Sequence, residues 1–233
     1  MAVLDARDVR LAFGATQALD GLTMSAEAAA VTALLGPNGA GKTTFIRCCT
    51  ALARPDSGTL TLFGNPPGSP QVLARIGLMP QSTGAWSGIR AGELLRYLAR
   101  LYDNPQPLPE LMALLGIDDF ARTPYRRLSG GQQKALNLAG ALVGRPSLVF
   151  LDEPTAGLDP RARRLTWDLI GAVRDAGVAV VLTTHDMAEA ETLADRVYIV
   201  DRGAVRTEGS VAQLAADGGL EEAFLRHTGG SIA

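Results

Sequence analysis

The segment Gly36-Pro37-Asn38-Gly39-Ala40-Gly41-Lys42-Thr43, called the phosphate loop below, restricts the possible folds of this chain more than any other feature. It fits the pattern G-x-x-x-x-G-K-[ST], in which backbone N–H groups of a glycine-rich loop surround anionic oxygens at the start of a helix. The apolar run Val31–Leu35 predicts a strand before it, and residues 42–52 predict a helix after it. The residue frequencies of this chain give roughly 0.003 chance matches. We therefore expect Lys42 to reach the β- and γ-phosphates of a nucleotide and the Thr43 hydroxyl to bind Mg²⁺.

Alternating strands and helices predict a largely parallel sheet with crossover helices after residue 146. The predicted strands and helices of this part are Leu148–Leu151, Pro160–Ala176, Val178–Thr183, Met187–Ala194 and Val197–Val200. The first thirty residues instead alternate apolar and polar side chains, with turn residues at Gly14 and Gly21, which is typical of an antiparallel β region. Two more predicted strands are Thr59–Phe63 and Ile76–Met79.

Between residues 89 and 144 the hydrophobic period becomes helical. One helix face is predicted to carry Leu94, Leu95, Leu98, Leu101 and Tyr102. We therefore expect a single α/β domain of 233 residues. Its nucleotide-binding core, with the antiparallel β region, takes residues 1–81 and 146–233, and a helical subdomain takes residues 82–145.

Composition narrows the classes of function. The 22 Lys and Arg residues against 24 Asp and Glu leave a net charge of −2, and no basic run offers a surface to nucleic acid. No apolar run approaches the length of a membrane span, and charges already interrupt residues 1–10, so we expect a cytoplasmic chain without a signal peptide.

The adjacent Cys48 and Cys49 are predicted core residues. Only two cationic residues are lysines, Lys42 and Lys134, and both lie in motifs.

Two acids follow the predicted strand Leu148–Leu151. Asp152 could complete a Mg²⁺ site, and Glu153 could polarise a water that attacks the γ-phosphate. Strands often end in acids, so this signal is weak by itself. Together with the phosphate loop it predicts the hydrolysis of a nucleoside triphosphate.

A second anion-binding helix start is predicted at Leu128-Ser129-Gly130-Gly131-Gln132-Gln133-Lys134, where Ser129 is the expected N-cap and the glycines leave N–H groups exposed. This segment, about twenty residues before the acidic strand, resembles the signature of ATP-binding-cassette (ABC) ATPases. The resemblance covers essentially the whole chain. It implies a P-loop NTPase (RecA-like) fold and a bound ATP with Mg²⁺.

The resemblance also implies roles for individual residues. Gln81, after Pro80, looks like the Q-loop glutamine that touches Mg²⁺ and the attacking water. His185 matches the switch histidine that contacts the γ-phosphate. Phe13 stands where the family stacks an aromatic ring on adenine, although a Phe on an amphipathic strand is as often a core residue. The implied catalytic residues are Glu153, His185 and Gln81. The implied Mg²⁺ ligands are Thr43, Gln81 and Asp152. The implied nucleotide contacts are Phe13, Gly36, Pro37, Asn38, Gly39, Ala40, Gly41, Lys42, Thr43, Thr44, Asp152, Ser129, Gly130, Gly131, Gln132 and Asp159, the last in a D-loop.

The family resemblance extends to function and partners. The chain looks most like the ATP-hydrolysing subunits of ABC-2 type exporters, peripheral on the cytoplasmic face of a membrane and bound to separate permease subunits. A groove near Trp86 and Tyr97 is expected to receive a permease helix. A second ATPase subunit, identical or different, is expected to dimerise head to tail, so that Ser129 and Gly131 close over the ATP held by Lys42 of the other subunit. The alternative is a soluble ABC ATPase of DNA repair, metal-cluster assembly or translation.

Overall fold

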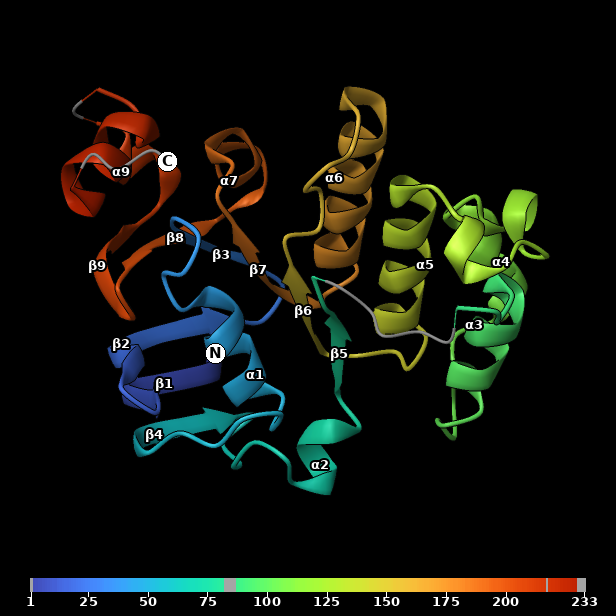
Figure 1. The fold of residues 1–233 in the computed structure, drawn as a ribbon, viewed down its shortest axis with the longest axis horizontal. Coiled ribbons are helices and arrows are strands. Elements are labelled where there is room, and N and C mark those ends of the chain that lie inside the picture. The colour runs from blue at the N-terminus through green and yellow to red at the C-terminus, as the bar shows by residue number, and fades with distance from the viewer. Residues whose placement is uncertain (1, 82–86, 217, 230–233) are drawn as a thin grey trace.

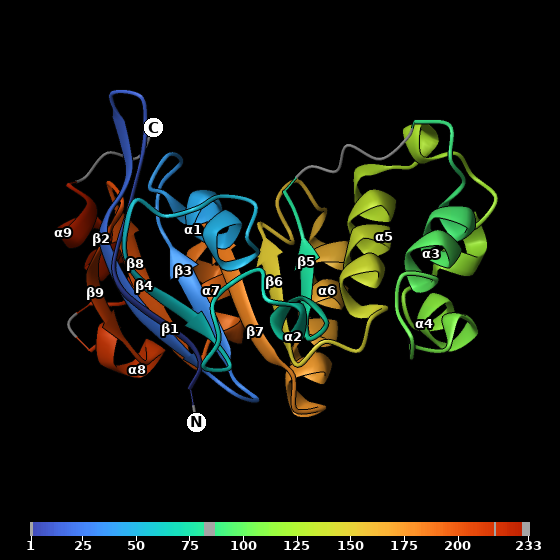
Figure 2. The same cartoon turned by 90° about the horizontal axis from the view of Figure 1, so that it is seen from below.

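Two β-sheets organise the protein, whose computed structural model describes residues 2–81, 87–216 and 218–229 (Figure 1). The smaller sheet is antiparallel, with strand order β2-β1-β4. Its strands are β1 (Ala2–Phe13), β2 (Thr16–Glu27) and β4 (Ser57–Leu62). The antiparallel region predicted for the first thirty residues is therefore present, and Figure 2 shows its β1–β2 hairpin projecting from the rest of the molecule.

The larger sheet has six strands in the order β5-β6-β7-β3-β8-β9. Its strands are β3 (Val31–Leu35), β5 (Ile76–Met79), β6 (Leu148–Asp152), β7 (Ala179–Thr184), β8 (Arg196–Asp201) and β9 (Ala204–Gly209). All neighbours are parallel except β8 and β9. In register, Asp152 lies opposite Thr183, and Leu35 lies opposite Thr184. The carboxyl ends of β3, β5, β6 and β7 therefore meet at one edge, where parallel sheets usually bind ligands.

Helices cover both faces of the larger sheet. The helices are α1 (Lys42–Cys49), α2 (Pro70–Leu73), α3 (Ala91–Ala99), α4 (Leu108–Leu114), α5 (Gly130–Leu142), α6 (Pro160–Asp175), α7 (Met187–Leu193), α8 (Val211–Leu214) and α9 (Leu220–Thr228), with short 3₁₀ turns at Ile117–Phe120 and Tyr125–Arg127. Strand residues alternate between two hydrophobic clusters: Leu35 belongs to the cluster with α5, α6, α7 and α9, whereas Leu34 belongs to the cluster with α1 and the smaller sheet. Cys48 and Cys49 are buried in the second cluster, as predicted.

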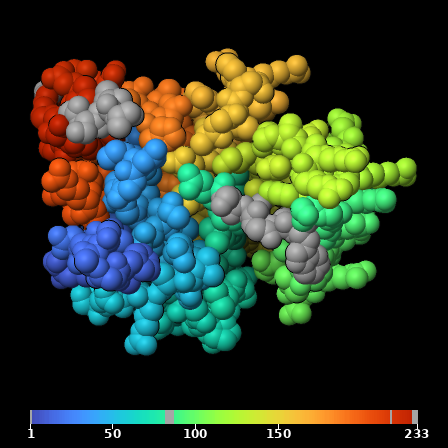
Figure 3. Space-filling model, in the orientation of Figure 1, coloured from blue at the N-terminus to red at the C-terminus, as the bar shows by residue number. Residues whose placement is uncertain are grey.

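The helical segment forms a lobe beside the larger sheet (Figures 1 and 3). Its last helix, α5, packs on β5 so closely that a Cβ at Gly77 would lie 2.0 Å from the Ala141 carbonyl oxygen. Residues of this segment and of the sheet share one hydrophobic cluster. No helix in the described part of the chain is long and apolar enough to cross a lipid bilayer.

Apart from shifted element ends, such as α1 ending at Cys49 instead of residue 52, the structure differs from the sequence-based expectation at two places. Gly21 does not form a turn but lies inside β2 with φ +83°, because the β1–β2 register shifts between Val9 and Arg10 and Gly21 is the extra residue of the bulge there. Leu101 is 64% exposed, because α3 ends at Ala99 and the predicted helical face ends with it. Trp86 lies outside the described residues.

Candidate functional site

The phosphate loop connects β3 to α1 and is shaped by glycines. A Cβ at Gly36 would lie 2.3 Å from the Val200 carbonyl oxygen, so only glycine fits there. Gly41 has φ +100°, and a Cβ on it would lie 2.5 Å from the Ala18 carbonyl oxygen. Gly41 is also the N-cap of α1, and within the described residues no side chain caps that helix start. The first N–H groups of α1 therefore remain available to an anion.

Lys42, the first residue of α1, is almost fully buried with 5% of its surface exposed. Its Nζ donates hydrogen bonds to the Gly36 carbonyl oxygen at 2.6 Å and to the Pro37 carbonyl oxygen at 3.0 Å. Burial lowers the pKa of Lys42, while the nearby charges of Glu153 and Asp152 act in the opposite direction. The loop thus holds a lysine cation beside the two acids of β6.

Asp152 receives hydroxyl donors from two sides. The Thr43 hydroxyl donates to Oδ2 of Asp152 at 2.8 Å, and the Thr183 hydroxyl donates to Oδ1 at 2.5 Å. The Asp152 side chain is buried, and the hydroxyl and carboxylate oxygens are the hard donors that Mg²⁺ prefers alongside phosphate oxygens. The pair Thr43 and Asp152 therefore fits a Mg²⁺ site.

Glu153 has an unusual backbone conformation for a residue that is not glycine. Its φ is +51°, which costs on the order of 1–3 kcal/mol and persists only where surrounding contacts hold it. Its N–H donates to the carbonyl and hydroxyl oxygens of Thr183, each at 3.1 Å. Its Oε1 lies 3.2 Å from Nδ1 of His185, whose side chain is 52% exposed against 9% for Glu153. The buried carboxylate thus has a half-exposed histidine as its neighbour.

Sequence reasoning did not foresee a third contact to Glu153. The Nζ of Lys134, on α5, donates a hydrogen bond of 2.6 Å to the Glu153 carbonyl oxygen. Burial lowers the pKa of Lys134, and the charges of Glu153, Asp152 and Glu189 oppose this effect. The available signal was the rarity of lysine, since the charges of Asp152 and Glu153 act on both lysines of the chain.

A buried carboxylate behind the site was also not predicted. Glu189 on α7 is 1% exposed, and its Oε1 accepts hydrogen bonds from the Thr155 hydroxyl at 2.6 Å and from Trp167 Nε1 at 3.2 Å. Burial raises the pKa of Glu189, and these donors oppose that rise. The cluster ties α6 and α7 to the loop after β6. Nothing in the sequence pattern distinguishes Glu189 from the other acids of α7.

The other predicted residues lie around this group. Gln81 is exposed two residues after the end of β5, whose carboxyl end lies beside that of β6. Ser129 caps α5: its Oγ accepts from the N–H of Gln132 at 3.2 Å, and Gln132 Oε1 accepts from the N–H of Ser129 at 2.9 Å.

Asp159 caps α6, where the N–H groups of Ala162 and Arg161 lower its pKa. Phe13 is 50% exposed and is therefore not a core residue.

The structure thus brings Lys42, Thr43, Asp152, Glu153 and His185 together at one edge of the sheet. It does not bring the signature to them. Among the residues that the structure describes, no hydrogen bond joins residues 129–132 or Asp159 to the phosphate loop, and Ser129, Gly130 and Asp159 are exposed.

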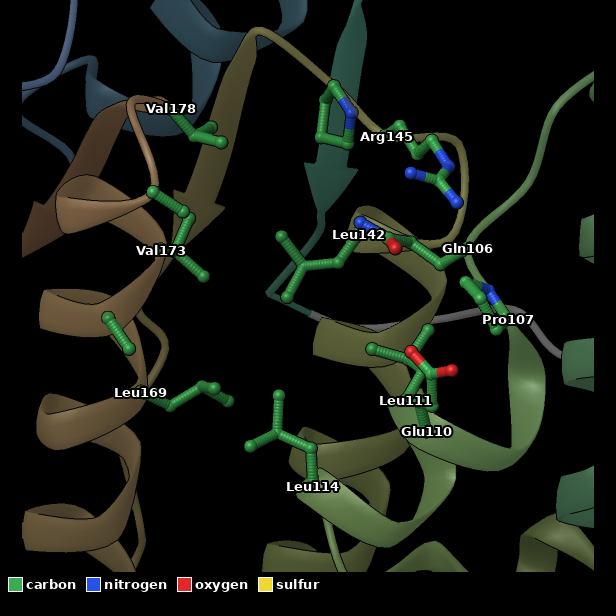
Figure 4. Close-up of a pocket in the computed structure, with 13 residues that line it drawn as sticks. Gln106, Pro107, Glu110, Leu111, Leu114, Leu142, Arg145, Leu169, Val173 and Val178 are labelled. Carbon is green, nitrogen blue, oxygen red and sulfur yellow. The ribbon is translucent and has the colours of Figure 1, made fainter.

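A hollow elsewhere in the protein contains none of these residues. It has a volume of about 380 Å³ and lies between α4, α5 and α6, where Leu114, Leu142, Leu169 and Val173 converge (Figure 4). Val178, which also lines it, directly precedes β7. The hollow therefore lies toward the amino ends of the strands, whereas the candidate site lies at their carboxyl ends.

Comparison with known proteins gives sequence relatives over nearly the whole chain. A family model described as "ABC transporter" matches residues 19–156. The chain is 38% identical over 221 residues to the daunorubicin/doxorubicin resistance ATP-binding protein DrrA of Streptomyces peucetius, covering 92% of this chain and 67% of that protein. It is 37% identical over 220 residues to the Nod factor export ATP-binding protein I of Cupriavidus metallidurans, covering 91% of this chain and 73% of that protein.

Solved structures share the fold at lower sequence identity. An ATP-binding subunit of an ABC transporter matches with a TM-score of 0.87 and 23% identity, covering 96% of this chain and 98% of that one. A bacterial ABC transporter cassette, whose structure is described as dimeric, matches with a TM-score of 0.80 and 22% identity, covering 89% of this chain and 98% of that one. These matches extend to almost every element described above.

Proposed function

This chain belongs to the ABC transporter family, as one of its ATP-binding subunits, and from that premise we propose that it drives export through separate membrane-spanning permease subunits. The family match includes the phosphate loop, the signature and the acidic strand, so the predicted family, fold class and ATPase activity are confirmed. The relatives are named for drug resistance and Nod factor export. These names fit the exporter prediction and not the alternative of a soluble ATPase in DNA repair, metal-cluster assembly or translation.

One observation carries the assignment of the site: three different strand ends deliver complementary groups to one edge of the sheet. The phosphate loop after β3 supplies Lys42 and Thr43, the end of β6 supplies Asp152 and Glu153, and His185 follows β7. Hydrogen bonds of 3.2 Å or less already join Thr43 to Asp152 and Glu153 to His185. The cation, the hydroxyl and the two carboxylates match the groups that catalyse phosphoryl transfer to water in P-loop NTPases, and the imidazole adds a partner for Glu153.

In the proposed mechanism the phosphate loop and the start of α1 bind the triphosphate. Lys42 exchanges its hydrogen bonds with the loop carbonyls for bonds to the β- and γ-phosphates. Thr43 and Asp152, with Gln81, would hold Mg²⁺, which would neutralise phosphate charge when bound. Thr44 follows Thr43 in α1 and contributes to the same anion site, and Phe13 stacks on the adenine.

Hydrolysis then depends on Glu153. Its carboxylate accepts a proton from the water that attacks the γ-phosphorus, while the bond from that phosphorus to the bridging oxygen breaks and ADP leaves. A carboxylate only accepts hydrogen bonds, so in the Glu153–His185 contact the proton lies on Nδ1 of His185. His185 thereby orients the carboxylate, and a contact of its Nε2 with a γ-phosphate oxygen requires the imidazolium, in which both ring nitrogens donate. The low exposure of Glu153 keeps bulk water from competing.

The exposed signature completes the site in a dimer. Ser129, Gly130, Gly131 and Gln132 present a capped helix start on the surface, apart from the phosphate loop of their own chain. A head-to-tail pair, homodimer or heterodimer, places this helix start over the ATP of the other subunit, with Asp159 along the interface. The subunit then lies on the cytoplasmic face of the membrane through its permease partners.

The catalytic part of the proposal is tested with Glu153→Gln. The amide keeps the shape of the side chain but loses the base, so ATP affinity should stay unchanged while turnover falls by roughly 10²–10⁴-fold. Calorimetry measures the first quantity and phosphate release the second. Glu191→Gln, an exposed glutamate of α7, is the matched control and should retain wild-type turnover. Wild-type hydrolysis by Glu153→Gln would assign the base to another residue, with His185 tested next.

The transport part is tested by purification from detergent extract. A co-purifying protein with several apolar spans supports a permease partner, whereas recovery with ribosomes or DNA contradicts it. Tyr97, 49% exposed on α3, offers a site for a Tyr97→Cys cross-link to a permease loop. Cross-links that form only from cysteines in α9 would place the permease elsewhere.

A further inference from the structure

The main chain of Glu153 is held by contacts from two other elements. β7 fixes its N–H through Thr183, and α5 fixes its carbonyl oxygen through Lys134, at 2.6 Å. α5 packs beside β5 and β6 (Figures 1 and 2), so Lys134 reaches the end of β6 from the helix that begins at the signature. Lys134 and its target are 19 residues apart in the chain.

The choice of acceptor is informative. Lys134 is half-buried and close to the charges of Asp152, Glu153 and Glu189, yet its Nζ donates a hydrogen bond to a main-chain carbonyl instead of a carboxylate. A charge-assisted bond of this length is among the stronger hydrogen bonds in proteins. It acts on Glu153, which directly follows β6 and has a positive φ, so an anchored carbonyl opposes relaxation to an ordinary strand conformation.

We propose that Lys134 is a positioning residue for Glu153: its ammonium group fixes the Glu153 carbonyl oxygen and thereby aims the Glu153 carboxylate, coupling the signature helix to the catalytic end of β6. This inference rests on the proposed role of Glu153 as the base. Relaxation of φ turns the Cα–Cβ bond of Glu153 and moves its carboxylate away from His185 and from the attacking water. Lys134 itself touches neither the nucleotide nor the water.

The test compares Lys134→Met with Lys134→Arg in the full-length protein. Methionine keeps the apolar stem and removes the donor, so kcat should fall by about 10- to 100-fold, since misplacement by about 1 Å has a cost of this size. The KM for ATP and the calorimetric ATP affinity should stay within about twofold, because the phosphate loop is untouched. Arginine keeps a donor cation and should restore most of kcat. An unchanged kcat in Lys134→Met, or no recovery in Lys134→Arg, overturns the proposal.

A neighbouring residue provides the structural control. Gln133 Nε2 donates to the carbonyl oxygens of Tyr125 and Leu128 at 3.4 and 3.3 Å, so it anchors α5 without reaching Glu153. Gln133→Met should lower Tm while kcat stays within about twofold. Equal losses of kcat in Gln133→Met and Lys134→Met would mean that general loosening of α5 explains the effect. If Lys134→Met fails to fold, Lys134→Gln, which keeps a shorter neutral donor, carries the same comparison.

A double-mutant cycle separates this inference from the proposed function. If Lys134 acts through Glu153, adding Lys134→Met to Glu153→Gln should lower the residual single-turnover rate by less than about twofold. A full 10- to 100-fold further loss means that Lys134 acts independently and overturns the inference. Wild-type activity of Glu153→Gln alone would instead overturn the catalytic assignment.

Discussion

At the scale of single residues, the two lysines are placed on opposite sides of the same acids. Lys42 approaches from the phosphate loop and Lys134 from α5, and for both the charges of Asp152 and Glu153 offset part of the effect of burial. The remaining cations of the chain are arginines. A lysine has a compact charge on a flexible stem, which can move from a carbonyl to a phosphate oxygen, whereas the planar guanidinium is larger and more rigid.

We expect Lys42→Ala to abolish ATP binding at concentrations where the wild-type protein is saturated. Removing a charge-assisted contact in a nearly buried site should cost at least about 2–3 kcal/mol, which is roughly 30- to 150-fold in affinity. Calorimetric titration with ATP measures the loss. Because Lys42 also donates hydrogen bonds to the loop carbonyls, a thermal melt of the variant without nucleotide should accompany the titration, to show that the variant is folded. Unchanged affinity in a folded variant would contradict the phosphate-loop assignment.

The sequence predicted the residues of the site that belong to local motifs. Lys42, Thr43, Asp152 and Glu153 lie in short segments whose spacing alone implies phosphate chemistry. The contact of Lys134 with the Glu153 carbonyl could not be predicted, because it depends on how α5 is oriented against β6 across 19 residues of chain. The same holds for Thr155, which binds Glu189 from 34 residues away.

At the scale of elements, strands and helices were predicted best where they are buried and regular. β5 was predicted with its observed bounds, because a short apolar run between breakers has few alternatives. Gly21 was misread because a bulge in a long strand and a turn both call for glycine. Hydrophobic period alone therefore identifies an element but not a local irregularity within it.

Gly77→Ala tests the contact between the helical segment and the sheet. A methyl group there would overlap the Ala141 carbonyl oxygen, so β5 or α5 must shift, at a cost of about 1–3 kcal/mol and a lower Tm. Gly171→Ala is the matched control, since a Cβ at that position of α6 meets no atom within 4 Å and should stabilise the helix by about 0.5–1 kcal/mol. Thermal melts that shift in the same direction for both variants would mean that α5 is free to move away from β5.

At the scale of the whole molecule, the separation of the two anion-binding helix starts is the main fact. α1 and α5 both begin with N–H groups suited to phosphate, and α5 keeps its own capping box instead of turning to the loop. The proposed dimer brings each α5 start to the other subunit's α1. Assembly should then depend on nucleotide, because ATP lies between the two surfaces.

Mixing two inactive variants tests this arrangement. Lys42→Ala and Ser129→Arg should each be inactive alone, and an excess of the first mixed with the second should recover part of the ATPase activity. The mixed dimer contains one intact site, with Lys42 from one chain and Ser129 from the other. No recovery, with mixed dimers shown to form, would mean that the motifs act within one subunit or that both sites must be intact. Wild-type specific activity that is independent of protein concentration would select the first explanation.

The Ser129 variant needs its own control, because it also removes a helix cap worth about 1 kcal/mol. Ser210 caps α8 with the same capping box, through Gln213. Ser210→Arg should therefore lose a similar amount of stability and retain full ATPase activity. If it were also inactive, loss of a cap and not loss of the signature would explain the Ser129→Arg result.

The placement of the two lysines, one buried and one half-buried, also has a consequence for protein chemistry. An acylating reagent that modifies side-chain amines has only two targets in this sequence, and both lie at the edge of the sheet that carries the candidate site. Surface lysines, which dominate such labelling in most proteins, give no background here. The rate of acylation of each amine, resolved by peptide mass, therefore reports how often that edge opens to solvent, and bound nucleotide should slow the reaction at Lys42 first.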